Sequence, residues 1–210
     1  MLQGVVHWTL AASYAICIQH MNRSAPKSDP VALRRGAARQ WVLKPQDVAV
    51  ALKLVILGPE RLAYAALGKA MHLSQFEAHA AVQRLIAAKL AVSIDGAIRP
   101  IAATLRRFLI NGAPYAYPPI RGEVVIGTPT AHAVPPLKDK FGPTSDLPPV
   151  WPDPNGSVRG QTLLPLYPGL PSAAKEDSQF YELVALLDAL RIGQAREREM
   201  AGKMLEARIK

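Results

Sequence analysis

The sequence predicts a mainly α-helical fold with a small β wing. Three observations lead to this prediction. Apolar residues recur at helical spacing between residues 45 and 90, an Asp-Gly pair then separates two short β-prone runs, and helical periodicity returns from residue 178 to the end. Between residues 113 and 176 prolines are frequent and periodicity is absent, which predicts an irregular, extended strap.

Composition favours a packed, basic protein that meets a polyanion. Half of the 210 residues are hydrophobic, and 25 Lys and Arg against 16 Asp and Glu give a formal net charge of +9. Residues 151–210 hold eight basic and eight acidic side chains, so the whole surplus lies in residues 1–150. We therefore expect nucleic acid, an acidic membrane or an acidic protein to contact the front of the chain. The one cysteine, Cys17, excludes an intrachain disulfide and a multi-cysteine zinc site.

Residues 1–43 are predicted to be a flexible basic extension. Residues 5–18 are apolar, but the positive segment that begins a secretory signal is missing. Three interpretations stay open: a start of translation at Met21 or later, which would make residues 1–20 non-native, a weak export signal, and a membrane attachment. The segment 22–39 either extends along phosphates or is a solvated lead-in. No apolar run reaches the roughly 18 residues of a membrane span, so we expect a cytoplasmic protein without a membrane partner.

Residues 44–90 predict three helices. The first begins at Pro45, because proline suits the first helical position, and it ends at Gly58-Pro59. A second, short apolar stripe runs from Leu62 to about Met71. The third helix begins at Ser74, since a serine followed three residues later by Glu77 is a capping-box signature. Its buried face contains Ala78, Ala81, Val82, Leu85 and Ile86, and it ends near Lys89-Leu90.

A hairpin follows the third helix. Asp95-Gly96 between two β-prone runs is a strong signal for a two-residue turn. A short amphipathic helix over residues 102–110 comes next and ends at Asn111-Gly112. Three helices and a hairpin in this order are typical of a winged helix-turn-helix, which we assign to residues 44–112.

The stretch LAYAALGKAMHLSQFEAHAAVQRLIAAKLAV resembles the winged-helix core of MarR-like bacterial transcription regulators. The resemblance rests on a small residue and Leu-Ser at the turn and on the pattern Val-x-Arg-Leu in the helix that follows, and it covers about 60 residues. It implies a DNA-binding regulator. The chain departs from the family at the wing tip, which is Asp95-Gly96 with Arg99 behind it instead of a basic cluster. The helices through which the family dimerises are not recognisable in order.

The solvent face of the third helix contains the candidate DNA contacts. A winged helix inserts this helix into the major groove. Its amide and guanidinium groups can form hydrogen bonds with adenine and guanine edges. Backbone N–H groups in its first turn can bind a phosphate, and nearby cations can neutralise the DNA backbone. The predicted DNA-binding residues are Ser74, Gln75, Phe76, His79, Gln83, Arg84, Lys69, Lys89 and Arg99.

The rest of the chain predicts contacts between parts of the protein or with a partner. The strap at 113–176 contains one short β-like run, residues 123–126, and large apolar residues that are expected to pack on the winged helix or on a partner. Its prolines also allow a proline-rich recognition sequence. The segment 177–210 is predicted to be helical, with Gly193 breaking or loosening it. Its thin apolar seam either forms a homodimer or folds back on its own chain.

These features favour a cytoplasmic bacterial DNA-binding transcriptional regulator, a repressor that reads two half-sites as a dimer. The alternative is a protein-interaction module, such as an antitoxin-like partner protein that also regulates its own operon. Thr128, Thr130 and His132 lie close in sequence, but no acid or nucleophile stands at a familiar spacing, and no phosphate-binding Gly-Lys-Ser/Thr motif occurs. The histidines form no metal-ligand pair. We therefore expect no enzymatic activity, no cofactor and no metal.

Overall fold

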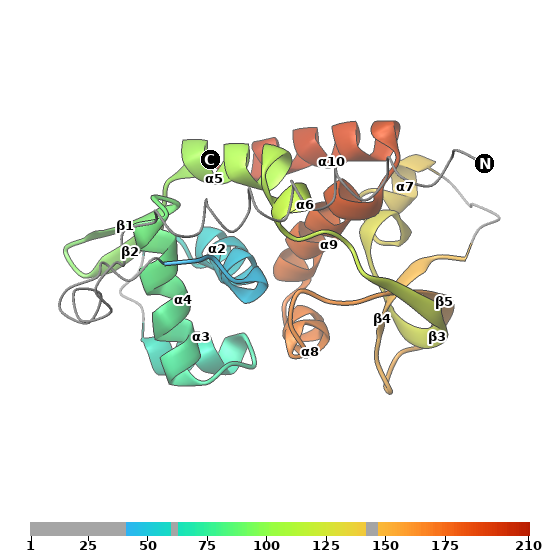
Figure 1. Ribbon diagram of the computed structural model, residues 1–210, viewed down its shortest axis with the longest axis horizontal. Helices are drawn as coiled ribbons and strands as arrows, with labels where there is room; N and C mark the ends of the chain where they lie inside the picture. Colours follow the sequence, from blue (N-terminus) through green and yellow to red (C-terminus); the bar gives the residue numbers. More distant parts are fainter. Residues whose placement is uncertain (1–40, 60–62, 142–146) are drawn as a thin grey trace, which may run out of the picture. The chain divides into compact units, whose positions relative to one another are not determined.

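Three helices and a β-hairpin come first in the part of the chain that the structure describes. This computed structural model describes residues 41–210 except 60–62 and 142–146, so the predictions for residues 1–40 lie outside the described residues. Residues 41–210 belong to one compact unit, mainly helical with two small sheets. The first elements are α2 (Pro45–Leu57), α3 (Tyr64–Ala70), α4 (Gln75–Ala87), β1 (Ala91–Ile94) and β2 (Ala97–Pro100) (Figure 1).

Helix α2 is buried on more than one side. The helical spacing of apolar residues predicts one buried face, but every residue from Asp47 to Leu54 is buried. The reason is that α2 packs against α4 on one side and against α9 (Ser178–Ile192), a helix from the far end of the chain, on another. The many short aliphatic residues of α2 allow this double packing.

Both ends of α4 are defined by local hydrogen bonds. The predicted capping box is confirmed: the Ser74 backbone N–H donates to Glu77 Oε2 at 2.9 Å, and the Glu77 N–H donates to Ser74 Oγ at 3.2 Å. At the other end, Lys89 adopts a positive φ of 57°. The Leu90 N–H then donates to the Leu85 carbonyl at 2.9 Å, which is the pattern of a Schellman motif.

The hairpin and the helix after it agree with the sequence. Strands β1 and β2 pair antiparallel around Asp95 and Gly96, which have φ values of 51° and 79°. Two positive φ values in succession are what a type I′ turn requires. Helix α5 (Ala102–Asn111) follows and ends at Gly112, as predicted.

The segment predicted as an irregular strap contains a small sheet. Strand β3 pairs antiparallel with both β4 and β5, and β4 and β5 pair in parallel. Sequence analysis found only the run at 123–126, because prolines stand at the ends of β3 and β4 and the partner strands are distant in sequence. The elements of this region are α6 (Ala113–Ala116), β3 (Arg121–Pro129), the 3₁₀ helix η2 (Ala131–Ala133), α7 (Lys138–Phe141), β4 (Pro149–Pro152), β5 (Val158–Leu163) and α8 (Leu170–Glu176).

The large apolar residues between Trp151 and Tyr167 are mostly buried, as expected, whereas Ile120, Val124 and Ile126 are exposed. Trp151, Leu163, Leu166 and Tyr167 all lie in the core, whereas Leu164 is exposed. They pack on the chain's own helices, so the region forms part of the core within residues 41–210.

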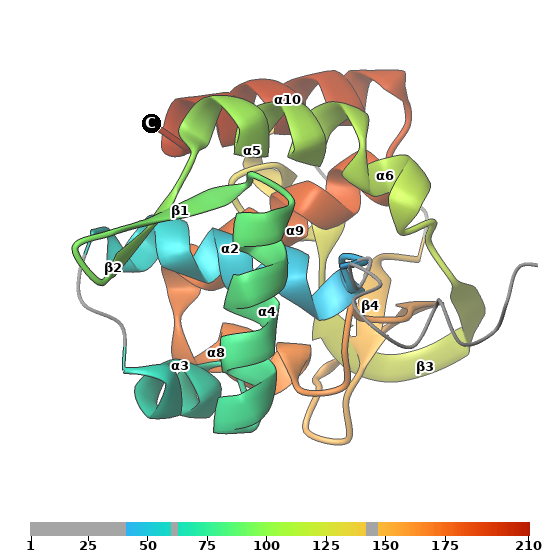
Figure 2. The ribbon, with the colours of Figure 1, turned by 60° about the vertical axis from the view of Figure 1, so that its left-hand side comes forward.

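The C-terminal segment folds back on its own chain. Gly193 ends α9, and α10 (Ala195–Arg208) packs along α9 and contacts α5 (Figure 2). The α10 side chains Ala201 and Leu205, together with Ile209, are buried against these neighbours. The apolar seam that the sequence left open for a partner helix is therefore occupied within the monomer.

A buried carboxylate on α9 joins the helices to the sheet. Asp188 is fully buried, and its Oδ2 accepts hydrogen bonds from Thr130 Oγ1 and Trp151 Nε1, both at 2.8 Å. Its Oδ1 accepts from Arg191 Nη1 at 2.7 Å, while Arg191 Nε donates to the carbonyl of Tyr117 at 2.9 Å. Burial raises the pKa of Asp188, and the three donors oppose this rise. Asp188 thus connects α9 to β4 and to the segment before η2, and its partner Arg191 extends the connection to the loop after α6.

We expect Asp188→Ala to lower the free energy of unfolding by about 3–5 kcal/mol, because it leaves the buried Arg191 guanidinium without its partner. Thr130→Val, which keeps the volume and removes one of the three hydrogen bonds to Asp188, should cost about 1 kcal/mol. Urea unfolding followed by circular dichroism measures both values. Equal losses for the two variants would contradict the central role of Asp188.

Candidate nucleic-acid interface

One face of α4 is uncovered by the described part of the chain. Gln75 and His79 are exposed, and Phe76 is 85% exposed, which is unusual for a phenylalanine. Gln83, one turn further along, is half-buried. In Figure 2 this helix lies in front of α2, with the hairpin at one end and α3 near the other. The amphipathic spacing of α4 buries Ala78, Ala81, Val82 and Leu85. The same spacing directs the side chains of Gln75, Phe76, His79 and Gln83 to the opposite side of the helix.

Two contacts orient the polar groups of this face. The His79 ring packs edge-on against the ring of Tyr64 from α3, with the ring centroids 4.8 Å apart. The Gln83 amide nitrogen lies 3.5 Å from His79 Nε2, at the limit of a hydrogen bond. His79 and Gln83 are thus aligned along the helix, next to the aromatic surface of Phe76 and Tyr64.

Three exposed cations lie around this helix. Lys69 is in the last turn of α3, Lys89 follows the end of α4, and Arg99 is on β2 of the hairpin. Two acidic residues occur in the same elements. Glu77 is engaged in the capping box, where hydrogen bonds from Ser74 lower the pKa of its carboxyl group, and Asp95 is at the hairpin tip. The interface is therefore only moderately basic.

Arg84 does not belong to this face, which corrects the prediction from sequence. It is only 9% exposed, and its Nε and Nη2 atoms donate to the two carboxylate oxygens of Asp47, each at 2.7 Å. The bidentate pair with Asp47 raises the pKa of Arg84. Tyr117 lies near this pair, and burial raises its pKa to about 12. Arg84 holds α4 to α2 and is not available to a duplex.

The turn between α3 and α4 is held by residues that sequence analysis missed. The Tyr167 hydroxyl donates to the carbonyl of Met71 at 2.8 Å, and His72 Nε2 lies 2.8 Å from Glu176 Oε1. Burial raises the pKa of the Tyr167 hydroxyl. The two residues of each contact are about 100 positions apart in the sequence, so no local pattern predicts the contact. The segment 167–176 fixes the point from which α4 starts.

Close backbone packing also positions this turn. A Cβ on Gly68 would lie 2.9 Å from the Leu73 carbonyl oxygen and 3.2 Å from the Gln75 nitrogen. Only glycine allows α3 to approach the start of α4 so closely.

Neither a metal cluster nor a membrane-crossing helix occurs among the described residues. Within them, no group of three or more His, Cys, Asp or Glu side chains is arranged to hold a metal ion. None of the described helices combines the length and the apolar character that crossing a bilayer requires. Comparisons of the chain with protein-family models, curated proteins and solved structures give no match.

We expect Arg84→Met to destabilise the fold by about 3–5 kcal/mol, because it leaves the Asp47 carboxylate buried without a counter-charge. The double variant Asp47→Leu/Arg84→Met should recover most of that loss, since both charges are then removed together. Chemical denaturation gives the free energies. If the double variant lost as much free energy of unfolding as Asp47→Leu and Arg84→Met lose together, the pair would not act as a unit.

Ser74→Ala should lower the free energy of unfolding at pH 7 by about 1 kcal/mol, through loss of the helix cap. Because Ser74 lowers the pKa of Glu77 in the folded state, the contribution of Glu77 is complete above its ordinary pKa near 4.5 and is lost as the pH falls through the folded value. The difference between wild type and Ser74→Ala should therefore narrow below pH 4.5 in urea unfolding. Ser178→Ala is the control, since Asp177 caps that helix. A difference independent of pH would argue against this coupling.

Proposed function

We propose that this chain is a DNA-binding transcriptional regulator, a repressor, whose residues 44–112 form a winged helix-turn-helix. The observation that carries the proposal is the uncovered face of α4, which follows α2 and α3 and precedes the β1–β2 hairpin. In winged-helix proteins the third helix enters the major groove. The resemblance of residues 62–92 to MarR-like regulators supports the same function.

The chemistry of the exposed side chains suits direct readout. A glutamine amide such as that of Gln83 can form two hydrogen bonds with an adenine edge, and the Phe76 ring can contact a thymine methyl group. Ser74 and Gln75 stand at the start of α4, where backbone N–H groups favour a phosphate. The proposal thus places readout of A·T pairs on α4.

Cations around α4 supply the contacts that do not depend on base sequence. Lys69, Lys89 and Arg99 are exposed and come from three consecutive parts of the module. Each phosphate that such a residue neutralises adds to the dependence of affinity on salt. A homodimer that reads two half-sites stays a prediction. The apolar seam of α10, which the sequence offered as the dimer contact, is occupied within the chain, so a dimer would need another surface.

A protein-interaction module, such as an antitoxin-like partner protein, is the second candidate. It is favoured by exposed apolar side chains on β3 and next to it. Val124 and Ile126, two residues apart on β3, are exposed. Ile120, just before β3, is exposed too, as is Leu164, whose N–H donates to the Ile120 carbonyl. Exposed apolar side chains that gather in one part of a surface are typical of a protein contact.

Selection of duplexes from a random library by the full chain, followed by anisotropy titration, tests the first candidate. Gln83→Ala and Phe76→Ala should reduce the affinity ratio between the selected and a scrambled duplex about tenfold. Lys89→Ala should weaken both duplexes alike and lower the salt slope by about one. Gln179→Ala and Lys138→Ala, at exposed positions on α9 and α7, are the matched controls.

Two results would contradict DNA readout by α4. The first is a selection that yields no preferred sequence. The second is an affinity ratio that neither Gln83→Ala nor Phe76→Ala changes. The interaction module would instead be identified by two results together. The chain would form a complex with the product of a neighbouring gene that Ile126→Lys abolishes, and it would not bind DNA.

A further inference from the structure

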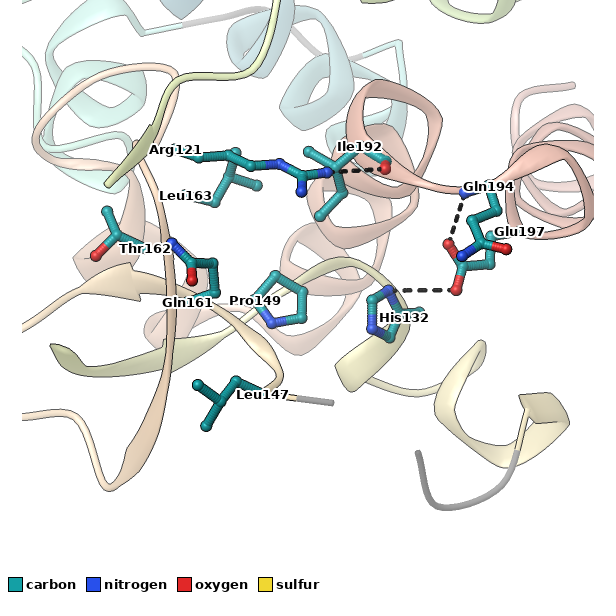
Figure 3. Close-up of a pocket in the computed structure, with 10 residues that line it drawn as sticks. All are labelled: Arg121, His132, Leu147, Pro149, Gln161, Thr162, Leu163, Ile192, Gln194 and Glu197. Carbon is teal, nitrogen blue, oxygen red and sulfur yellow. Dashed lines mark hydrogen bonds and ion pairs between the residues drawn. The ribbon is translucent and has the colours of Figure 1, made fainter. Parts of the chain in front are cut away.

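A cavity of about 380 Å³ lies away from α4, between the three-stranded sheet and the turn that joins α9 to α10. Arg121 at the start of β3, Gln161 and Leu163 on β5, and Glu197 on α10 line it (Figure 3). Ligand sites of small molecules commonly have volumes of this order. The proposed DNA contacts do not involve it.

Two opposite charges in this cavity are anchored on one turn. Arg121 Nη2 donates to the carbonyl of Ile192 at 3.3 Å, and Glu197 Oε2 accepts from the backbone N–H of Gln194 at 2.9 Å. Ile192 and Gln194 are two residues apart, so their Cα atoms are separated by at most about 7 Å. The guanidinium and the carboxylate are therefore held a short distance apart, and Figure 3 shows them on neighbouring sides of the cavity.

These charges do not neutralise each other. Among the described residues Arg121 has no carboxylate within ion-pair distance, and the side chain beside the Glu197 carboxylate there is His132, with Nδ1 at 3.5 Å from Oε1. An unpaired guanidinium beside a separate carboxylate is an arrangement that a ligand with both a negative and a positive group would complete.

Gly193 keeps the carboxylate in this position. A Cβ on Gly193 would lie 2.9 Å from both Glu197 Cβ and Glu197 Oε2, and 2.4 Å from the Ala189 carbonyl oxygen. Any other residue would displace the turn or Glu197. The turn is thus built to bring the α10 carboxylate close to the backbone that holds Arg121.

The remaining lining is part apolar and part polar. Pro149, Leu163 and Ile192 contribute aliphatic surface. Thr162 is 5% exposed and its hydroxyl has no hydrogen-bond partner in the described part of the chain, although the residue lines the cavity. A buried hydroxyl without a partner costs free energy unless a ligand or water satisfies it.

We propose that this cavity binds a small zwitterion of the amino-acid class, with its carboxylate on Arg121, its ammonium group on Glu197 and its aliphatic part against Pro149, Leu163 and Ile192. The opposite charges anchored on one turn carry this inference. It stands independently of the proposed DNA binding.

Isothermal titration of the full chain with L-leucine and 4-aminobutanoate as probes tests the proposal. At least one of the two should bind. The matched compounds for leucine are 4-methylpentanoate, which lacks the amino group, and 3-methylbutylamine, which lacks the carboxylate; each should bind at least tenfold more weakly than leucine if leucine is the ligand. For 4-aminobutanoate the corresponding compounds are butanoate and propylamine.

Variants locate the site. Arg121→Met and Glu197→Gln should each weaken binding of the zwitterion at least tenfold, while Arg159→Met, at an exposed position on β5, should leave it unchanged. Unchanged circular dichroism shows that the variants are folded. The proposal is overturned if neither zwitterion binds, if the one-charge compound binds as tightly as its zwitterion, or if folded Arg121→Met and Glu197→Gln retain full affinity.

Discussion

The architecture of this protein depends on the carboxylate of Asp188. Desolvation of a charge in the core is costly, and Asp188 is tolerated because Arg191, Trp151 and Thr130 surround it with donors. The same arginine extends the network to the backbone at Tyr117. Since these groups come from α9, β4, the segment before η2 and the loop after α6, one buried anion sets how the sheet is placed on the helices.

A second buried ion pair positions the candidate interface. Asp47 and Arg84 lock α2 to α4 through two short hydrogen bonds. The arginine that stood out as a possible base contact instead fixes the rotation of α4 about its axis. That rotation leaves Phe76 and His79 in solvent and directs Leu85 into the core. The uncovered face is thus a consequence of a charge pair on the covered one.

The C-terminal helices connect the two regions of interest. Helix α9 packs against α2, and the turn after it anchors both charges of the proposed zwitterion cavity. The segment 167–176 reaches the start of α4 through Tyr167 and Glu176. The cavity and the uncovered face of α4 therefore belong to one framework of packed helices within residues 41–210.

Local signals determined much of the first half of the described chain. The capping box at Ser74, the proline at the start of α2 and the Asp95-Gly96 turn each act within a few residues, so the sequence alone predicted α2, α4 and the hairpin. Tertiary structure decided four other features: the sheet, the double burial of α2, the burial of Arg84 and the charges brought together at the α9–α10 turn. Their partners are tens to about a hundred residues apart, and such pairings are selected by the total burial and charge compensation of the whole fold, which no local pattern records.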